Sequence, residues 1–104
     1  MILSTTEFVP DRQIDKILGI ARGSTVRSRN AARDLVAQLK NIIGGEIEEY
    51  TKLQADAREQ ALQRMISDAK KLDADAIVNV RFTTSVVAQG ASEMLAYGTA
   101  VKLK

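Results

Sequence analysis

The sequence has neither histidine nor cysteine among its 104 residues. Without thiols it can form no disulfide and offers no thiol nucleophile, and without imidazole it lacks the commonest general base. Soft and borderline metal ions prefer thiolate and imidazole ligands, so a transition-metal site within one chain is disfavoured. The absence of cysteine suits a reducing compartment, and we expect a cytoplasmic protein.

Aromatic residues and long apolar runs are also scarce. Tryptophan is absent, and the two phenylalanines and two tyrosines are too few for a platform on which nucleic-acid bases stack. The net charge is only +2, with basic residues interleaved among acids, so we expect neither nucleic acid nor a membrane as partner. No apolar run approaches the ~18 residues of a membrane span, and the first residues lack the layout of a secretory signal.

The composition that is present is that of an ordinary globular chain. Apolar residues make up 45% and charged residues 27% of the sequence, with one proline. The length predicts a single domain, residues 1–104. A domain of this size is close to the point at which a second subunit often completes the burial of apolar surface, so the length is compatible with self-association.

The first part of the chain has the pattern of two strands, over residues 1–6 and 14–26. In the second strand apolar side chains fall on both faces, and Gly19 and Gly23 interrupt it. A glycine within a strand indicates a bulge or a close approach of another backbone.

Two helices are predicted next, over residues 30–43 and 46–72. Asn30 is a suitable N-cap for the first, and apolar residues then recur at helical spacing. The second helix has one apolar stripe and a length of roughly 40 Å at 1.5 Å per residue, so part of it is expected to pack on another subunit. Asp73 ends it, because aspartate tolerates the left-handed conformation.

The period then changes from 3.6 to 2, which predicts two further strands joined by a turn at Gln89-Gly90. One face of the first is expected to hold Ala76, Val78, Val80, Phe82, Thr84 and Val86. The last strand has a small-residue face that something could approach closely, made of Met94, Ala96, Gly98 and Ala100. We therefore predict an α+β fold in the order strand–strand–helix–helix–strand–strand, with two helices on one face of an antiparallel sheet of about four strands.

Several short segments, in this order and spacing, are similar to those of the YbjQ-like family of small bacterial and archaeal proteins labelled "putative heavy-metal-binding". The segments are Ser4-Thr5-Thr6, Arg33-Asp34, Ile43-Gly44-Gly45 with Tyr50, Ala57-Arg58, Ala74-Asp75-Ala76-Ile77-Val78 and Gly98-Thr99-Ala100-Val101-Lys102. The resemblance covers nearly the whole chain and implies a ring-shaped homo-oligomer, a homopentamer. One departure is Asp73, where the family usually has glycine.

The best group of oxygen ligands in the sequence is Asp68, Asp73 and Asp75, near the end of the long helix. Carboxylates suit a hard cation. A structural alternative explains the same residues: Asp73 ends the helix, and Asp68 pairs with Lys71 on a solvated helix face. In a ring, weak oxygen ligands from several subunits could converge on the symmetry axis, which keeps metal binding open.

Four arginines surround the predicted start of the first helix: Arg22, Arg27, Arg29 and Arg33. Guanidinium groups beside free helix N–H groups favour phosphate or carboxylate, which makes anion or nucleotide binding by Arg27, Arg29 and Arg33 a further hypothesis. The alternative is a solvated strand end with Arg33 paired to an acid across an interface.

No nucleophile–base pair and no phosphate-binding loop can be identified, so we expect no catalytic residue and no enzyme activity. The function predicted is that of a cytoplasmic homo-oligomeric binding or structural module. The sequence does not identify its ligand or cofactor. Metal binding through oxygen ligands shared between subunits and anion binding at the first helix are the alternatives.

Overall fold

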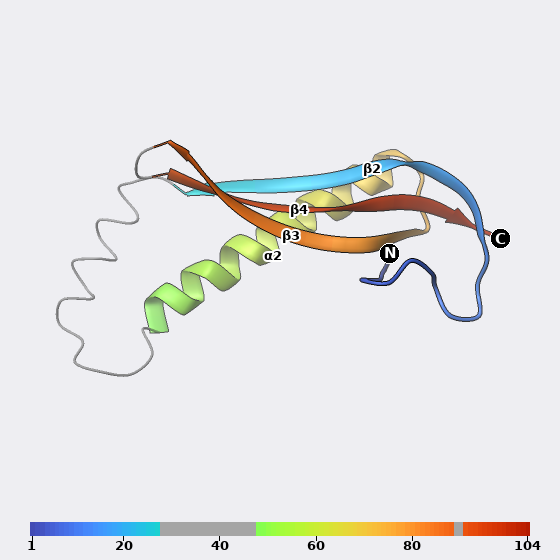
Figure 1. Ribbon diagram of the computed structural model, residues 1–104, viewed down its shortest axis with the longest axis horizontal. Helices are drawn as coiled ribbons and strands as arrows, with labels where there is room; N and C mark the ends of the chain where they lie inside the picture. The colour runs from blue at the N-terminus through green and yellow to red at the C-terminus, as the bar shows by residue number, and fades with distance from the viewer. Residues whose placement is uncertain (28–47, 89–90) are drawn as a thin grey trace.

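The computed structural model describes residues 1–27, 48–88 and 91–104, apart from the side chains of residues 27, 48–51 and 53. Within these residues, a four-stranded sheet carries a long helix on one face (Figure 1). The elements are β1 (Ile2–Leu3), β2 (Ile14–Arg27), α2 (Glu48–Lys71), β3 (Ala76–Ala88) and β4 (Ala91–Leu103).

The strands lie in the order β1-β3-β4-β2. β4 pairs antiparallel with β2 on one side and with β3 on the other, whereas β1 pairs parallel with β3. The prediction of an antiparallel sheet is therefore wrong, because the sheet contains both parallel and antiparallel pairs. The physical reason is that residues 4–13 cross from one edge of the sheet to the other, so β1 and β2 are not neighbours.

The prediction of two helices on one face also needs correction. In the part of the chain that the structure describes there is one helix, α2, and the elements follow the order strand–strand–helix–strand–strand. The first predicted helix, over residues 30–43, and the turn at Gln89-Gly90 lie outside the described residues. The structure is that of one chain and shows no ring-shaped assembly.

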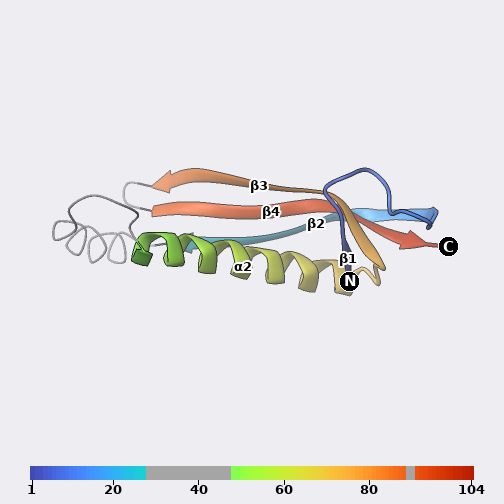
Figure 2. The same ribbon diagram turned by 90° about the horizontal axis from the view of Figure 1, so that it is seen from below.

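Small residues bring α2 close to the sheet. Ala61, Met65 and Ala69 are fully buried in one cluster that also contains Ala21 of β2 and Ala96 of β4. Figure 2 shows α2 lying along one face of the sheet. The small-residue face predicted for the last strand is thus covered by the helix of the same chain.

The two glycines of β2 have the two roles that the sequence left open. A Cβ built on Gly23 would lie only 2.2 Å from the backbone nitrogen of Met65, so glycine is required there by the close approach of α2. Gly19 has φ 143° and follows a register shift between β2 and β4, so it belongs to a bulge.

β3 changes face in its middle, which corrects the predicted alternation. Ala76 and Val78 are buried on the face away from α2, whereas Val80 is buried on the α2 side. Asn79 lies between them with φ 54°, inside a register shift against β4. One residue in the left-handed conformation therefore moves Val80 and the residues after it to the opposite face.

A second, smaller core lies on the face away from α2. Val9, from the segment that connects β1 to β2, covers Val78, Val101 and Leu103 there. This segment covers one end of that face only. We call the remainder, which faces away from α2 and is not covered by residues 4–13, the open face.

Candidate functional site

Two of the three predicted metal ligands meet one lysine of β4 at the C-terminal end of α2. The Lys102 Nζ lies 3.3 Å from Asp73 Oδ2 and 3.4 Å from Asp75 Oδ1, and it donates to the Asp73 carbonyl oxygen at 3.0 Å. Asp73 has φ 62°, which confirms the predicted left-handed helix end. The position between these oxygens, where a cation would be placed, is taken by an ammonium group of the chain itself.

The charges of this cluster stabilise one another. The Leu103 N–H donates to Asp75 Oδ2 at 2.9 Å and lowers the pKa of Asp75, and Lys102 lowers it further. Hydrogen bonding to Asp73, and then to Asp75, raises the pKa of Lys102. Both ionised forms are therefore favoured at neutral pH, and the group joins the helix end to the last strand.

The third predicted ligand, Asp68, lies elsewhere. Its Oδ2 accepts the backbone N–H of Arg22 at 3.0 Å, and one turn earlier in α2 the Arg64 guanidinium donates to the Ser24 carbonyl oxygen at 2.5 Å. Arg22 and Ser24 are in β2, at one edge of the sheet. Two charged side chains of α2 thus occupy backbone groups that the edge strand would otherwise leave free.

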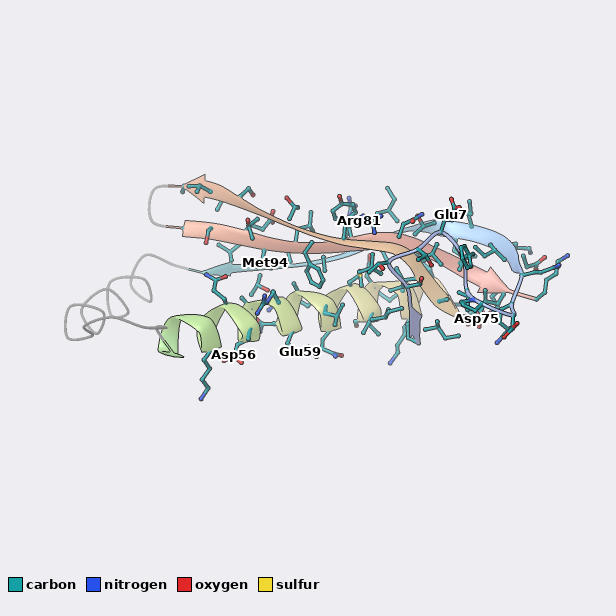
Figure 3. The ribbon with its side chains drawn as sticks, turned by 60° about the horizontal axis from the view of Figure 1, so that its bottom comes forward. Glu7, Asp56, Glu59, Asp75, Arg81 and Met94 are labelled. Carbon is teal, nitrogen blue, oxygen red and sulfur yellow. The ribbon has the colours of Figure 1, made fainter. Side chains whose placement is uncertain are left out.

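The three aspartates are consequently not gathered into one ligand set. Among residues 1–27, 48–88 and 91–104, no three acidic side chains are grouped so that they could hold a metal ion. Asp73 keeps one property that suits a shared site, because its side chain is 95% exposed. Figure 3 shows Asp75 near the C-terminal end of β4, far from Asp56 and Glu59 on α2.

The arginines of the anion hypothesis are only partly described. Arg27 is the last residue of β2 and pairs with Ser92 of β4, while Arg29 and Arg33 lie outside the described residues. Anion binding by these three residues stays a prediction. Arg22 is exposed, and its side chain is on the open face, because its neighbours Ala21 and Gly23 face α2.

Arg22 has an unexpected neighbour on the open face. Tyr97 of β4 is directly opposite Arg22 on one side and directly opposite Arg81 of β3 on the other. The two arginines are thus two strand spacings apart, about 10 Å. Arg81 lies on the side of the sheet away from α2 (Figure 3) and donates to the Thr5 carbonyl oxygen at 2.8 Å. This row of arginine, tyrosine and arginine could not be recognised from sequence, because it depends on strand register.

The Ser4-Thr5-Thr6 segment of the family resemblance forms a hydrogen-bonded turn. The Thr6 N–H donates to Ser4 Oγ at 3.0 Å, and Thr6 Oγ1 donates to the Phe8 carbonyl oxygen at 2.9 Å. The Arg81 contact to Thr5 holds the same turn against β3. These three residues shape the segment that covers the second core.

Lys102 is the residue that the sequence analysis missed. It lies in the Gly98–Lys102 segment of the resemblance, but nothing in the strand pattern distinguishes it from an ordinary solvated lysine. Its role follows from Asp73 and Asp75, which are distant in sequence.

Among the described residues, none forms a helix with the length and apolar composition of a membrane span.

The fold and these contacts define a class: a small α+β protein in which, among the described residues, one helix covers one face of a mixed sheet. The chain belongs to the YbjQ family, whose model, described as "Putative heavy-metal-binding", matches residues 1–104.

Relatives occur in archaea and bacteria under the name UPF0145 protein. The chain is 60% identical to one from Archaeoglobus fulgidus, covering 100% of this chain and 96% of the relative. It is 54% identical to one from Vibrio campbellii, covering 99% of each. A crystal structure of a protein of unknown function in the DUF74 family, from Pediococcus pentosaceus, matches with a TM-score of 0.66 at 15% identity and covers 100% of this chain and 98% of that one. This structure supports the fold alone.

Proposed function

We propose that the protein is a homo-oligomeric binding or structural module whose subunits associate through the open face of the sheet. The observation that supports this is the row of apolar side chains that β2 presents there: Ile17, Ile20 and Val26 are 74%, 67% and 56% exposed. Their cross-strand partners place all three on the face away from α2. Ile17 and Ile20 are near each other on this face, and Val26 lies farther along β2, beyond Arg22 and Ser24. Exposed apolar groups that are rimmed by polar residues are typical of interaction surfaces.

The apolar row is large enough to contribute to an interface. Burying one such side chain fully is worth about 1.5–3 kcal/mol, so covering three of them contributes several kcal/mol before the cost of association. Arg22 and Tyr97 lie on the same face, and both residue types are enriched where subunits meet. A second copy of the chain is the expected occupant, because the family resemblance implies a homopentamer.

The proposal assigns no catalytic activity and includes a cytoplasmic location. Both parts are supported by the composition, since the chain has no histidine and no cysteine. Neither nucleic acid nor a membrane is expected as a partner.

Native mass spectrometry of the untagged protein tests the proposal, because one spectrum gives the subunit number and any bound mass. We expect an oligomer at micromolar concentration, with five subunits if the family resemblance extends to the assembly. Ile20→Lys should shift the population towards fewer subunits, whereas Ser67→Lys, on the exposed outer face of α2, should not. A monomeric wild-type protein would contradict the proposal.

Metal binding through oxygen ligands shared between subunits is the second candidate. It is favoured by the description of the family model and by the exposed Asp73 carboxylate at the helix end. Since Lys102 already bonds Asp73 and Asp75, we expect the isolated chain to bind divalent ions weakly and an oligomer to bind them better. Titration with Mn²⁺ and Zn²⁺ of wild type and of the double variant Asp73→Asn and Asp75→Asn tests this. Equal uptake by the two proteins would remove these residues as ligands.

A further inference from the structure

The outer edge of β3 has backbone groups that point away from the sheet. The Val80 N–H donates to the Ser4 carbonyl oxygen and the Asn79 N–H to the Thr6 carbonyl oxygen, both at 2.9 Å. Beyond Val80, no residue of the described structure pairs with this edge. Since backbone groups alternate in direction along a strand, Phe82, Thr84 and Val86 direct their N–H and C=O groups outward.

The two edges of the sheet are treated differently. At the β2 edge, Asp68 and Arg64 of α2 occupy outward-facing backbone groups, which is a common protection against pairing with another strand. At the β3 edge, residues 82–88 include no charged residue and no proline, and all of them are exposed. Such an edge is a template for an added strand.

We propose that residues 82–86 of β3 pair with the same residues of a second copy in an antiparallel arrangement centred on Thr84. This proposal rests on the proposed self-association and names one contact within it. The β2 edge of another copy is a poorer partner, because Asp68 and Arg64 already occupy it. The occupant is therefore the β3 edge itself, related by a two-fold axis.

The sequence of this edge is complementary to itself in that register. Phe82 of one copy lies opposite Val86 of the other, and these side chains are 47% and 79% exposed in the single chain. Aromatic and β-branched residues form favourable cross-strand pairs. On the other face Thr83 lies opposite Ser85, so hydroxyl groups meet and no like charges face each other.

A two-fold contact predicts an even number of subunits. If five subunits also associate through the open face, the complete assembly contains ten chains. If the β3 edge acts alone, the protein is a dimer. In the native mass spectrum a species of two or ten chains supports the two-fold contact, whereas a wild type of five chains overturns it and leaves the association through the open face in place.

The absence of cysteine makes a cross-linking test simple. In the proposed register Thr84 lies opposite its own counterpart, about 5.5 Å away between Cα atoms, which is within the range for a disulfide. Under mild oxidation, Thr84→Cys should form disulfide-linked dimers at least tenfold faster than Thr83→Cys, its neighbour on the same strand. Mixing Phe82→Cys with Val86→Cys should yield the mixed dimer.

A second pair of variants tests whether the edge contributes to the assembly. Thr84→Pro removes an N–H that faces away from β4, so the sheet of the single chain should persist, while association should weaken at least tenfold in analytical ultracentrifugation. If Thr84→Pro fails to fold, Thr84→Lys serves instead, since it places two lysines opposite each other.

The outcomes separate this inference from the proposed function. An oligomeric wild type whose assembly is unchanged in Thr84→Lys, or a Thr84→Cys that cross-links no faster than Thr83→Cys, overturns the edge contact and leaves self-association in place. A monomeric wild type overturns both. Fast cross-linking with loss of assembly in Thr84→Lys establishes the β3 contact.

Discussion

Replacing Gly23 by alanine should push α2 outward from the sheet and lower the stability of the fold. The added Cβ would lie 2.2 Å from the Met65 nitrogen and 2.5 Å from the Ala61 carbonyl oxygen, whereas an ordinary contact is 3.4–4 Å. The helix backbone would have to move by about 1 Å along its closest approach to β2. Backbone atoms cannot rotate away as a flexible side chain can, so we expect a cost at the upper end of the range for overpacking, about 3 kcal/mol.

That cost is a large part of the stability of a domain of this size, about 5–15 kcal/mol. At roughly 4–8 °C for each kcal/mol, the melting temperature should fall by about 12–24 °C. Urea unfolding followed by circular dichroism, together with calorimetry, measures both quantities. Ser24→Ala, one residue further along β2, is the matched control and should change stability by less than about 0.5 kcal/mol. A Gly23→Ala protein as stable as that control would refute the close approach of helix and strand.

Three other substitutions test the contacts around this helix. Because the folded-state pKa of Asp75 is lowered, its ionised carboxylate stabilises the folded protein at neutral pH, and this stabilisation is lost as the pH falls below about 4. Asp75→Asn should therefore flatten the acid side of the profile of stability against pH, measured from urea midpoints. The pKa of Lys102 is raised, so its ammonium group stabilises the folded protein at neutral pH, and this stabilisation is lost as the pH rises past about 10.4. Lys102→Met should flatten the alkaline side of the same profile, and an unchanged slope would contradict the role given to this lysine. Thr25 Oγ1 is buried and donates to the Ala57 carbonyl oxygen at 3.0 Å, so Thr25→Val should cost about 1 kcal/mol in urea unfolding, and no loss would show that the bond adds nothing.

Local signals in the sequence predicted the elements well. The long helix was expected over residues 46–72 and runs over Glu48–Lys71, because its apolar stripe and its end at Asp73 are both encoded within a few residues. The close approach at Gly23 was among the two possibilities that glycine indicates. The strand predicted over 14–26 is confirmed as Ile14–Arg27, because the pattern that predicts a strand is also a local one.

The errors concern contacts between distant residues. The parallel pairing of β1 depends on the path of residues 4–13 across the sheet, which no periodicity encodes. The face change at Asn79 breaks the alternation on which the strand prediction relied. At the candidate site, Asp73 and Asp75 were found together because they are close in sequence, whereas their contact with Lys102 depends on the tertiary fold.

The position of β4 has a consequence for how the chain reaches this structure. β4 is the last strand in chain order, yet it lies between β2 and β3, which do not contact each other through hydrogen bonds. During synthesis, β2 and β3 must wait for residues 91–103 before either acquires its main neighbour. Folding should therefore be governed by contacts of long sequence separation and be slow for a chain of this length. Until β4 joins, β2 and β3 both lack this neighbour, and their unpaired backbone groups make this the stage at which the chain is most exposed to aggregation.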